Sequence, residues 1–279
     1  MTKLKNLKVN VQNLSFCNNA EIILISGPCQ IESQDHALRT CEQIAEITNK
    51  VGIKFVYKSS FDKANRTSIE SSRGLGIEKG LRILEKVKKE FNCCILTDVH
   101  ESWQCKEVSV VVDIIQIPAF LCRQTDLLIS AAKTGKTINV KKGQFLSPFE
   151  IKHVVSKIES SGNKNILITE RGTMFGYNNL VTDIRSLSII KKLGYPVIFD
   201  ATHSVQLPGN SETSGGEREF VPILARAAVT VGISSLFVET HENPYVAPSD
   251  SNSMLSLDKL EKLLEQIKMF DDLTKKIIV

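Results

Sequence analysis

The sequence lacks the features that mark several large classes of protein. No apolar segment approaches the roughly 18 continuous residues that a membrane-spanning helix needs, and the first residues mix lysine with polar and apolar residues instead of forming the apolar block of a signal peptide. It also lacks a long basic run: 35 basic against 31 acidic residues leave a formal charge of only +4. We therefore expect a soluble protein that binds neither membranes nor nucleic acids, and any local excess of positive charge is to be sought in a pocket for a small anion.

The cysteines do not form the pattern of a disulfide-stapled protein. There are seven, an odd and irregularly spaced set, and Cys93 and Cys94 are adjacent inside an apolar run that is typical of a strand. The chain is also much larger than disulfide scaffolds are. These features predict reduced thiols and a cytoplasmic location. With 279 residues and 42% hydrophobic content the chain can bury one large core, so residues 1–279 are expected to form one domain.

Short apolar runs rich in β-formers alternate with amphipathic segments along the chain. The runs are nearly continuous in Val, Ile, Leu and Phe, as in parallel strands buried on both faces, and lie at residues 22–26, 53–57, 94–97, 113–117, 137–140, 165–169, 196–199 and 235–238. Helical spacing occurs at residues 37–50, 76–90, 127–133, 148–160, 184–193, 220–231 and 257–270, with a short, weak helix at 103–110. Eight strands, each followed by a helix, predict an α/β fold, a single (β/α)8 TIM barrel.

An open, doubly wound sheet shares this alternation and is the competing fold. It normally has a glycine-rich phosphate loop after the first strand, and Gly27-Pro28-Cys29 does not fit that pattern. Residues 1–20 precede the first barrel strand, and 7–11 and 14–16 are expected to pair as a hairpin that caps the bottom of the barrel. Residues 207–219, rich in Gly, Ser and Glu, predict a mobile loop.

Polar residues stand at the C-terminal end of every predicted strand. In chain order they are Cys29, Lys58, Asp98 with His100, Gln116, Lys141 with Lys142, Glu170 with Arg171, Asp200 with His203, and Glu239 with His241. A single lysine in such a place is usually solvated, and a single cysteine is more often a small buried hydrophobic residue. Because all eight strands carry such a group at the end where active sites of this fold lie, the pattern predicts a functional mouth.

Two kinds of chemistry can be separated within this mouth. A cationic set suits phosphate and carboxylate groups and consists of Lys58, Lys63, Arg66, Lys141 and Arg171. A mixed set of thiolate, imidazole and carboxylates suits a divalent transition metal such as Zn, Fe or Mn and consists of Cys29, His203, Glu239 and Asp250. The four candidate ligands lie far apart in the sequence, so the spacing alone is a weak signal, and only closure of the barrel would bring them together.

Seven segments of the chain carry a resemblance to a known family. They read GPCQIES (27–33), YKSSFDKANRTS (57–68), TDVHE (97–101), QIPAFLCRQTD (116–126), NVKKGQ (139–144), ERGTMFGY (170–177) and DATHSVQ (200–206). From about residue 22 to 267 the chain resembles the 3-deoxy-D-manno-octulosonate 8-phosphate (KDO 8-phosphate) synthases. The resemblance implies a transferase that condenses phosphoenolpyruvate, D-arabinose 5-phosphate and water to KDO 8-phosphate and phosphate, in the biosynthesis of the KDO of lipopolysaccharide.

A related family, the 3-deoxy-7-phosphoheptulonate synthases, shares the fold and uses erythrose 4-phosphate. It typically has Lys-Pro-Arg-Thr-Ser where this chain has KANRTS (63–68). The difference favours the arabinose enzyme, because Asn65 can hydrogen-bond a hydroxyl that the shorter sugar lacks. Two other functions are alternatives. A metal-dependent barrel hydrolase would not need five cationic side chains around its site. A non-catalytic barrel that binds sugar phosphates would explain the cations but not the four candidate metal ligands.

The resemblance also implies a metal-dependent enzyme. The metal-independent branch of the synthases has Asn where this chain has Cys29, and Cys-Asp-Gly where it has Ser249-Asp250-Ser251. The implied ligands are Cys29, His203, Glu239 and Asp250. Residues 207–219 and 243–252 differ in detail from the commonest family patterns. The family further implies a homotetramer in which loops near Phe120 complete a neighbouring site.

Roles for the mouth residues follow as hypotheses from the resemblance. Phosphoenolpyruvate would be held by Lys141, Arg171 and Lys58, and the sugar phosphate by Arg66, Asn65 and Ser60, with Gln116, Gln144 and Gln206 as further substrate-binding residues. Lys63 would lie near the reacting carbons. Either a metal polarises the sugar aldehyde or Lys63 donates a proton to it, and either His203 or water held by the metal acts as the base. Asp98 and Glu239 would orient these groups.

Overall fold

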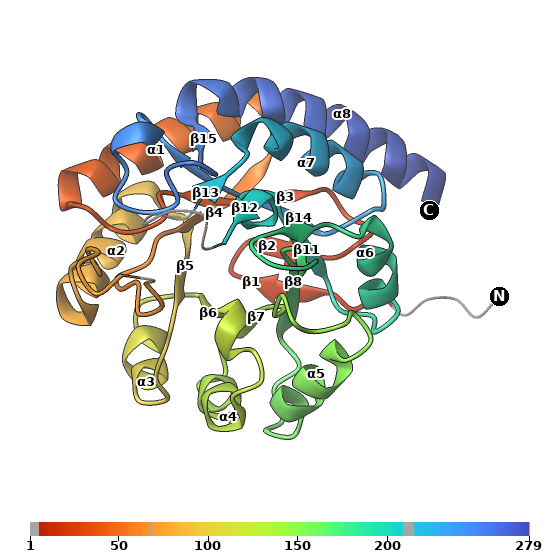
Figure 1. The fold of residues 1–279 in the computed structure, drawn as a ribbon, viewed down its shortest axis with the longest axis horizontal. Helices are drawn as coiled ribbons and strands as arrows, with labels where there is room; N and C mark the ends of the chain where they lie inside the picture. The colour runs from red at the N-terminus through yellow and green to blue at the C-terminus, as the bar shows by residue number, and fades with distance from the viewer. Residues whose placement is uncertain (1–5, 67, 209–214, 279) are drawn as a thin grey trace.

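The protein is described by a computed structural model of residues 6–66, 68–208 and 215–278. Eight parallel strands form its centre: β3 (Ile23–Gly27), β4 (Lys54–Lys58), β5 (Cys94–Asp98), β6 (Ile114–Ile117), β7 (Thr137–Lys141), β8 (Ile166–Glu170), β11 (Val197–Asp200) and β14 (Ser235–His241). Each pairs with the next along the chain, and β14 pairs with both β11 and β3, which closes the sheet. The predicted barrel is therefore confirmed (Figure 1).

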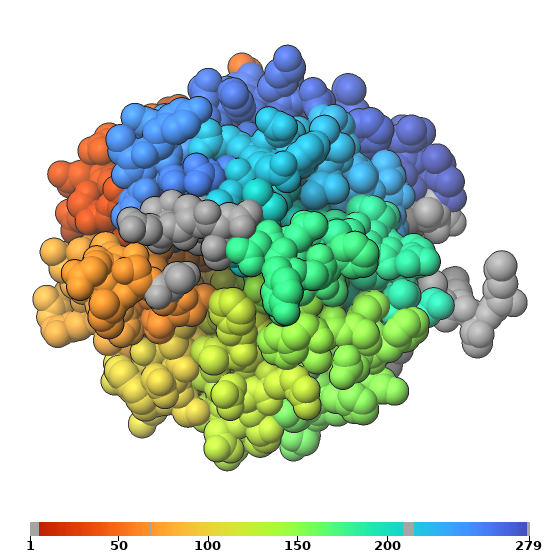
Figure 2. All heavy atoms as spheres, in the orientation of Figure 1, coloured from red at the N-terminus to blue at the C-terminus, as the bar shows by residue number. Residues whose placement is uncertain are grey.

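Eight helices follow the strands and surround them: α1 (Gln34–Val51), α2 (Ile77–Phe91), α3 (Gln104–Ser109), α4 (Thr125–Lys133), α5 (Ile151–Glu159), α6 (Ile184–Lys191), α7 (Val221–Val229) and α8 (Leu260–Ile278). All eight predicted helical segments are confirmed, with shifted ends. In α2 the buried residues Gly80, Ile83, Leu84 and Val87 recur at helical spacing, so one stripe faces the strands. Figure 2 shows successive segments of the chain following one another around the molecule, as expected for repeated strand–helix units.

The barrel is closed at one end by the predicted hairpin, which the structure confirms. Strands β1 (Val9–Val11) and β2 (Leu14–Phe16) pair antiparallel, and their buried side chains pack on inward-facing strand residues such as Ile25 and Phe237. Beside the turn, Gln12 Nε2 donates to Asp113 Oδ1 at 2.8 Å, and Asp113 immediately precedes β6. Because this contact lies at the N-terminal end of a barrel strand, the hairpin covers the bottom and leaves the opposite end for a site.

Short additional pairings lie at that opposite end. They are β9 (Thr173–Met174) with β10 (Leu180–Val181), β12 (Gln206–Leu207) with β13 (Gly215–Gly216), and β15 (Leu255–Ser256) with the end of β14. In the segment 207–219, predicted to be a mobile loop, Leu207 pairs with Gly215, and residues 209–214 lie outside the described residues. Within the described chain, no helix is long and apolar enough to cross a membrane.

Candidate active site

Twelve of the fifteen residues predicted to bind substrate or metal or to act in catalysis line one cavity at the C-terminal ends of the strands. Those on its wall are Lys58, Lys63, Asn65, Arg66, Asp98, Gln116, Lys141, Gln144, Arg171, His203, Gln206 and Asp250. The other three predicted residues are buried and hydrogen-bond to that wall: Cys29 to Asp250, Ser60 to Asp98, and Glu239 to Lys58. Barrel closure therefore brings all the predicted site residues into one connected region, although they are spread from position 29 to position 250.

A buried ion pair forms part of the floor. Lys58 Nζ donates to Glu239 Oε1 at 2.8 Å and to the carbonyl oxygen of Cys29 at 3.2 Å. Burial opposes ionisation of Glu239, but the charge of Lys58 keeps the pKa of this carboxyl below its ordinary value. The floor is tightly built, because a Cβ on Gly27 would lie 2.0 Å from the carbonyl oxygen of Lys58. Only glycine allows β3 to approach the end of β4 this closely.

Three of the four predicted metal ligands lie together. Donor atoms of Cys29, Glu239 and Asp250 are all within 4.8 Å of one another, and the Cys29 thiol donates to Asp250 Oδ2 at 2.9 Å. His203 is outside this group of three, but its Nε2 lies 3.7 Å from Glu239 Oε2. Burial, and then the charges of Asp250 and Glu239, raise the pKa of the Cys29 thiol well above its ordinary value.

These four residues fit a bound cation. Glu239 Oε2 is buried and has no hydrogen-bond partner among the described residues, a costly state for a carboxylate oxygen. It faces an imidazole nitrogen and lies in a pocket that also holds a thiol and a second carboxylate. A divalent ion would satisfy that oxygen and would replace the proton on Cys29, since the thiolate is the form that ligates. The mixture of sulfur, nitrogen and oxygen donors suits a transition metal.

His203 is oriented by Asp200, a residue whose role the sequence did not reveal. The backbone N–H of His203 donates to Asp200 Oδ1 at 2.8 Å, and its Nδ1 lies 2.8 Å from Asp200 Oδ2. Lys141 Nζ also donates to Oδ2. Burial opposes ionisation of Asp200, but His203 and Lys141 hold the pKa of this carboxyl far below its ordinary value. With Nδ1–H donated to Asp200, the lone pair of His203 Nε2 is directed toward Glu239.

Asp98 is a second ionised carboxylate in the wall. Ser60 Oγ donates to its Oδ1, and His100 Nε2 lies 3.1 Å from its Oδ2. Burial would raise the pKa of Asp98, but the hydrogen bond from His100 and the charges of Lys63 and Lys58 hold it well below its ordinary value. Asp98 therefore offers the cavity a fixed negative charge and acceptor oxygens.

The remaining cationic side chains differ in how many of their N–H donors already have a hydrogen-bond acceptor in the protein. Arg66 donates to Ser249 Oγ at 2.7 Å and to Gln30 Oε1 at 2.9 Å, so it bridges the loops that follow β14 and β3. Arg171 donates to the carbonyl oxygen of His203 at 2.9 Å, but its Nε is buried and has no partner among the described residues. Lys63 also lines the cavity and lies among the acidic groups Cys29, Glu239 and Asp98. Arg171 thus retains a donor for a ligand, and Lys63 offers it a positive charge.

The predicted glutamines connect the wall. Gln206 accepts from Arg171 and donates to Asp250 Oδ1, so it joins the cationic side to the candidate metal ligands. Gln116 Oε1 accepts from Asn139 Nδ2 at 3.1 Å. Gln144 Oε1 is buried and has no partner among the described residues. Neighbouring residues that the sequence did not identify as site residues include Gln30 and Asn139, which reach the site through Arg66 and Gln116, and Ser249, which lines the cavity and accepts from Arg66.

Known proteins resemble the chain over nearly its whole length. A sequence model of the DAHP synthetase I family matches residues 6–276. The 2-dehydro-3-deoxyphosphooctonate aldolase of Rickettsia canadensis is 59% identical over 268 residues, which cover 96% of this chain and 98% of the relative. The enzymes of the same name from Bartonella henselae and Brucella ovis are 58% identical over 274 residues and 57% identical over 271 residues, covering 98% and 97% of this chain and 98% of each relative.

Proposed function

The chain belongs to the DAHP synthetase I family, and on this premise we propose that it performs the reaction named for its 2-dehydro-3-deoxyphosphooctonate aldolase relatives. That reaction condenses phosphoenolpyruvate with D-arabinose 5-phosphate and water, forms a C–C bond and releases inorganic phosphate. The observation that carries it is identity of 55% to 59% to proteins of this name over nearly the full length. The shared name favours the eight-carbon product over the seven-carbon product of erythrose 4-phosphate.

Phosphoenolpyruvate is assigned to the side of the cavity formed by β4, β7 and β8. Lys141 and Arg171 are proposed to bind its phosphate, since the buried Nε of Arg171 has no other partner among the described residues. Lys58, fixed on the floor by Glu239, would face the carboxylate. Gln144 and Gln116 are assigned to the same substrate from their place in the wall. A substrate fixed by several such groups enters the reaction already oriented, which can remove several kcal/mol from the barrier.

Arabinose 5-phosphate is assigned to the side formed by the loop after β4. Arg66 is held at Nε, NH1 and NH2 by four hydrogen bonds, to Ser72, Ser249, Gln30 and Pro248. That arrangement fixes the plane of the guanidinium and leaves one N–H of the fork, with the full charge, for the sugar phosphate. Asn65 and Ser60 are proposed to bind sugar hydroxyls.

Lys63 is the proposed proton donor for the first step. Burial by itself would lower the pKa of Lys63, but the surrounding acidic groups, Cys29, Glu239 and Asp98 first among them, raise it, so the amine carries a proton. C3 of phosphoenolpyruvate attacks the aldehyde carbon, a C–C bond forms, and the developing alkoxide takes a proton from Lys63 Nζ. An alkoxide is basic enough to accept this proton despite the raised pKa of the amine.

The second step adds water to C2. Loss of the enol electrons to the new bond leaves C2 electron-poor, so a water attacking it is acidified and even a weak base can accept its proton. Asp98 is proposed as that base, because it is ionised and lines the cavity. In the intermediate the C2 hydroxyl gives up its proton to the departing phosphate as the C2=O bond forms, and the C2–O bond to phosphate breaks to release inorganic phosphate.

A divalent ion of the Zn, Fe or Mn type is proposed to be held by Cys29, His203, Glu239 and Asp250. When bound it would supply Lewis-acid polarisation of the sugar aldehyde. His203 Nε2 cannot both ligate and accept a proton, so this assignment leaves the imidazole as a ligand oriented by Asp200. The support for the ligand set is the partnerless oxygen of Glu239 among these groups.

We further propose that residues 1–279 act as one domain in a cytoplasmic homotetramer. Phe120 lines the cavity and is 55% exposed, and Phe175 and Tyr177, in the connection between β9 and β10, are 73% and 98% exposed. Large apolar side chains at a cavity rim are a typical surface for contact with another subunit. Sedimentation of the purified chain tests the assembly.

The test of function is phosphate release from phosphoenolpyruvate, offered with arabinose 5-phosphate or erythrose 4-phosphate, with and without a strong chelator. Release with arabinose 5-phosphate that stops with chelator and returns with added metal supports the proposal. Release with erythrose 4-phosphate in preference contradicts the substrate, and release without either sugar indicates a hydrolase. No release with either sugar would leave a sugar-phosphate-binding barrel as the better description.

A further inference from the structure

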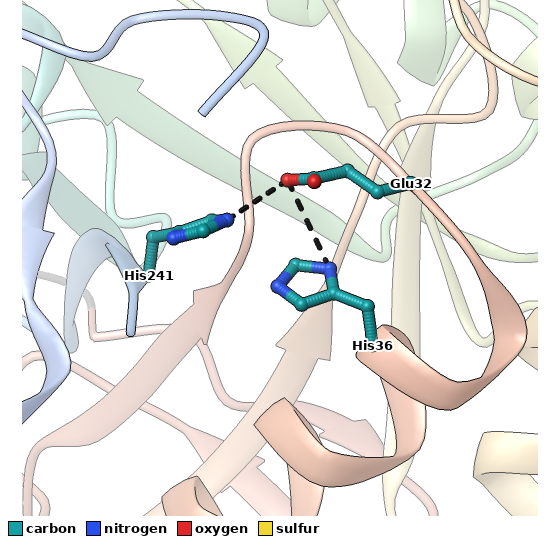
Figure 3. Close-up of side chains that lie close together, drawn as sticks. All are labelled: Glu32, His36 and His241. Atoms are coloured by element: carbon teal, nitrogen blue, oxygen red, sulfur yellow. Dashed lines mark hydrogen bonds and ion pairs between the residues drawn. The ribbon is translucent and has the colours of Figure 1, made fainter. Parts of the chain in front are cut away.

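A second cluster of acids and imidazoles lies beside the candidate metal ligands but outside the cavity wall. Glu32 is three residues after Cys29, in the loop between β3 and α1, and His36 is in the first turn of α1. His241 ends β14, two residues after Glu239. Figure 3 shows Glu32 directed toward both imidazoles. Glu242 follows His241 and completes the group of four, here named the His–Glu clasp.

Two reciprocal hydrogen bonds form the clasp. His241 Nε2 lies 2.9 Å from Glu32 Oε1, and His36 Nε2 lies 2.9 Å from Glu242 Oε2. Each of the two chain segments therefore provides one carboxylate and one imidazole to the other. The imidazole rings lie 4.8 Å apart, and their side chains are only 6% and 3% exposed.

The contacts identify the clasp as hydrogen-bonded rather than metal-binding. The backbone N–H of Asn243 donates to His241 Nδ1 at 2.9 Å, so the proton of the neutral ring is on Nε2 and is given to Glu32. A metal would need the lone pair at that same Nε2. His36 Nδ1 lies 3.9 Å from Glu32 Oε1, which is beyond hydrogen-bond range. Both links are complete with neutral imidazoles.

The clasp lies where the backbone pairing between β3 and β14 ends. The pairing of these strands stops at Gly27 opposite Glu239, and the last two residues of β14 pair with β15 instead. The loop after β3 is fastened on its other side, because the N–H of Ile31 donates to the carbonyl oxygen of Ser60 at 2.9 Å. Among the described residues, no backbone hydrogen bond joins residues 28–33 to β14. Side chains join the two sides of this gap instead: Lys58 Nζ donates to the carbonyl oxygen of Cys29 and to Glu239 Oε1, and the clasp adds a second link farther from the floor of the cavity.

We propose that the His–Glu clasp positions the metal ligands by fixing the separation of Cys29 from Glu239. This inference rests on the metal centre of the proposed function. Cys29 is on one side of the gap and Glu239 on the other, and each is within three residues of a clasp member. Ligands must be held to within about 0.5 Å for a tight site, and loss of groups that orient ligands typically weakens metal affinity by about 10- to 100-fold.

The experiment measures Cd²⁺ binding to the full chain after metal removal. Calorimetry gives affinity and stoichiometry, and the ultraviolet charge-transfer absorption of a Cd²⁺–thiolate bond reports Cys29 directly. The variants are E32A, which removes one link; E32Q, whose amide oxygen can still accept from His241; and C29A. The matched control is E261A, which removes the hydrogen bond and ion pair that join Lys50, at the far end of α1, to α8.

The proposal expects one Cd²⁺ per chain with the thiolate band in the native protein and in E261A. E32A should bind about 10- to 100-fold more weakly, and E32Q should recover most of the affinity. If E32A does not fold, E242A provides the milder test, because Glu242 is 45% exposed and only the second link is lost.

Three results would overturn the proposal. Native affinity in E32A would do so even if its melting temperature fell, because the clasp would then be structural only. Cd²⁺ binding that survives C29A but disappears in H36A would make the clasp itself a cation site. Absence of the thiolate band in the native chain would remove the metal centre of the proposed function, and the clasp with it.

Discussion

Replacing Asp200 by Asn is expected to destabilise the protein strongly and in a pH-dependent way. Asp200 is fully buried and accepts from Lys141 Nζ and from the backbone and ring nitrogens of His203. Asn keeps the size of the side chain but places an NH2 group where one oxygen stood. That group is a donor facing two donors, so Lys141 loses its counter-charge and His203 loses the acceptor for Nδ1.

The loss of unfolding free energy in D200N depends on whether Lys141 stays charged without a partner or releases its proton. Removing one member of a buried ion pair typically costs about 3–5 kcal/mol. The lysine can limit this cost by releasing its proton. At pH 7, deprotonating a group whose unfolded pKa is about 10.4 costs at most about 4.6 kcal/mol, and at pH 9 about 1.9 kcal/mol. Burial already lowers the pKa of Lys141 in the native protein, which points the same way.

The sign of the pH dependence follows. In D200N the folded-state pKa of Lys141 lies below its unfolded value, so folding releases a proton. The penalty is then largest at neutral pH and is relieved as the pH rises toward the unfolded pKa. We expect the difference in unfolding free energy between native protein and D200N to shrink by up to about 2–3 kcal/mol between pH 7 and pH 9.

Urea unfolding of the chelator-treated proteins at both pH values measures this difference. The control is the double variant D200N/K141M, in which no buried charge is left unpaired. It should be more stable than D200N at pH 7 and should lose the extra pH dependence. A penalty below about 1 kcal/mol for D200N at pH 7, or one that stays the same at pH 9, would refute the reasoning.

Three further predictions concern the metal, the substrates and the hairpin. Because burial raises the pKa of the Cys29 thiol, a bound metal must displace its proton. The affinity for Zn²⁺, measured in competition assays, should therefore rise about 10-fold or more per pH unit from pH 6 to 8. An affinity that does not depend on pH would contradict this. R66A should raise KM for arabinose 5-phosphate about 10- to 100-fold with little change for phosphoenolpyruvate, and R171A should do the reverse; equal effects on both substrates would contradict the assignment. F16A removes a fully buried ring at the barrel bottom and should cost about 3–5 kcal/mol in denaturant unfolding while leaving kcat unchanged in the folded enzyme; a lowered kcat would show that the hairpin acts on the site.

The order and type of the barrel elements could be predicted because hydrophobic periodicity is a local property. The ends of helices were less predictable. The predicted last helix covered 257–270, whereas α8 runs to Ile278. Asp271 and Asp272 interrupt the apolar pattern and suggest an end. In the structure Asp271 is buried, its Oδ2 accepts from the N–H of Ile22 at 3.0 Å, and its Oδ1 lies 3.4 Å from Lys275 Nζ, so the inner face tolerates an acid through a contact 249 positions away in the sequence.

In the candidate site, too, contacts between residues far apart in the sequence could not be predicted from local patterns. The search for polar residues at strand ends located Cys29, Lys141 and Glu239, because each lies at or near the C-terminal end of its own strand. Which of the strand-end residues contact one another could not be predicted this way. Asp200 and His203 are neighbours in sequence, but their joint contact with Lys141 exists only because β7 and β11 face a common interior. Arg66 and Ser249 meet across 183 positions.

The pairing of charges explains how a mouth with so many lysines and arginines can be buried before any substrate arrives. Lys58 is neutralised by Glu239 and Lys141 by Asp200, so these cations are held in place without repelling one another. Lys63 and Arg171 line the cavity, and Arg171 Nε meets no partner among the described residues, so an incoming phosphate is drawn to them. A metal replacing the proton of Cys29 adds a further net positive charge beside Lys63. Phosphate affinity should therefore rise when metal is bound, and the metal and the anion should strengthen each other's binding reciprocally.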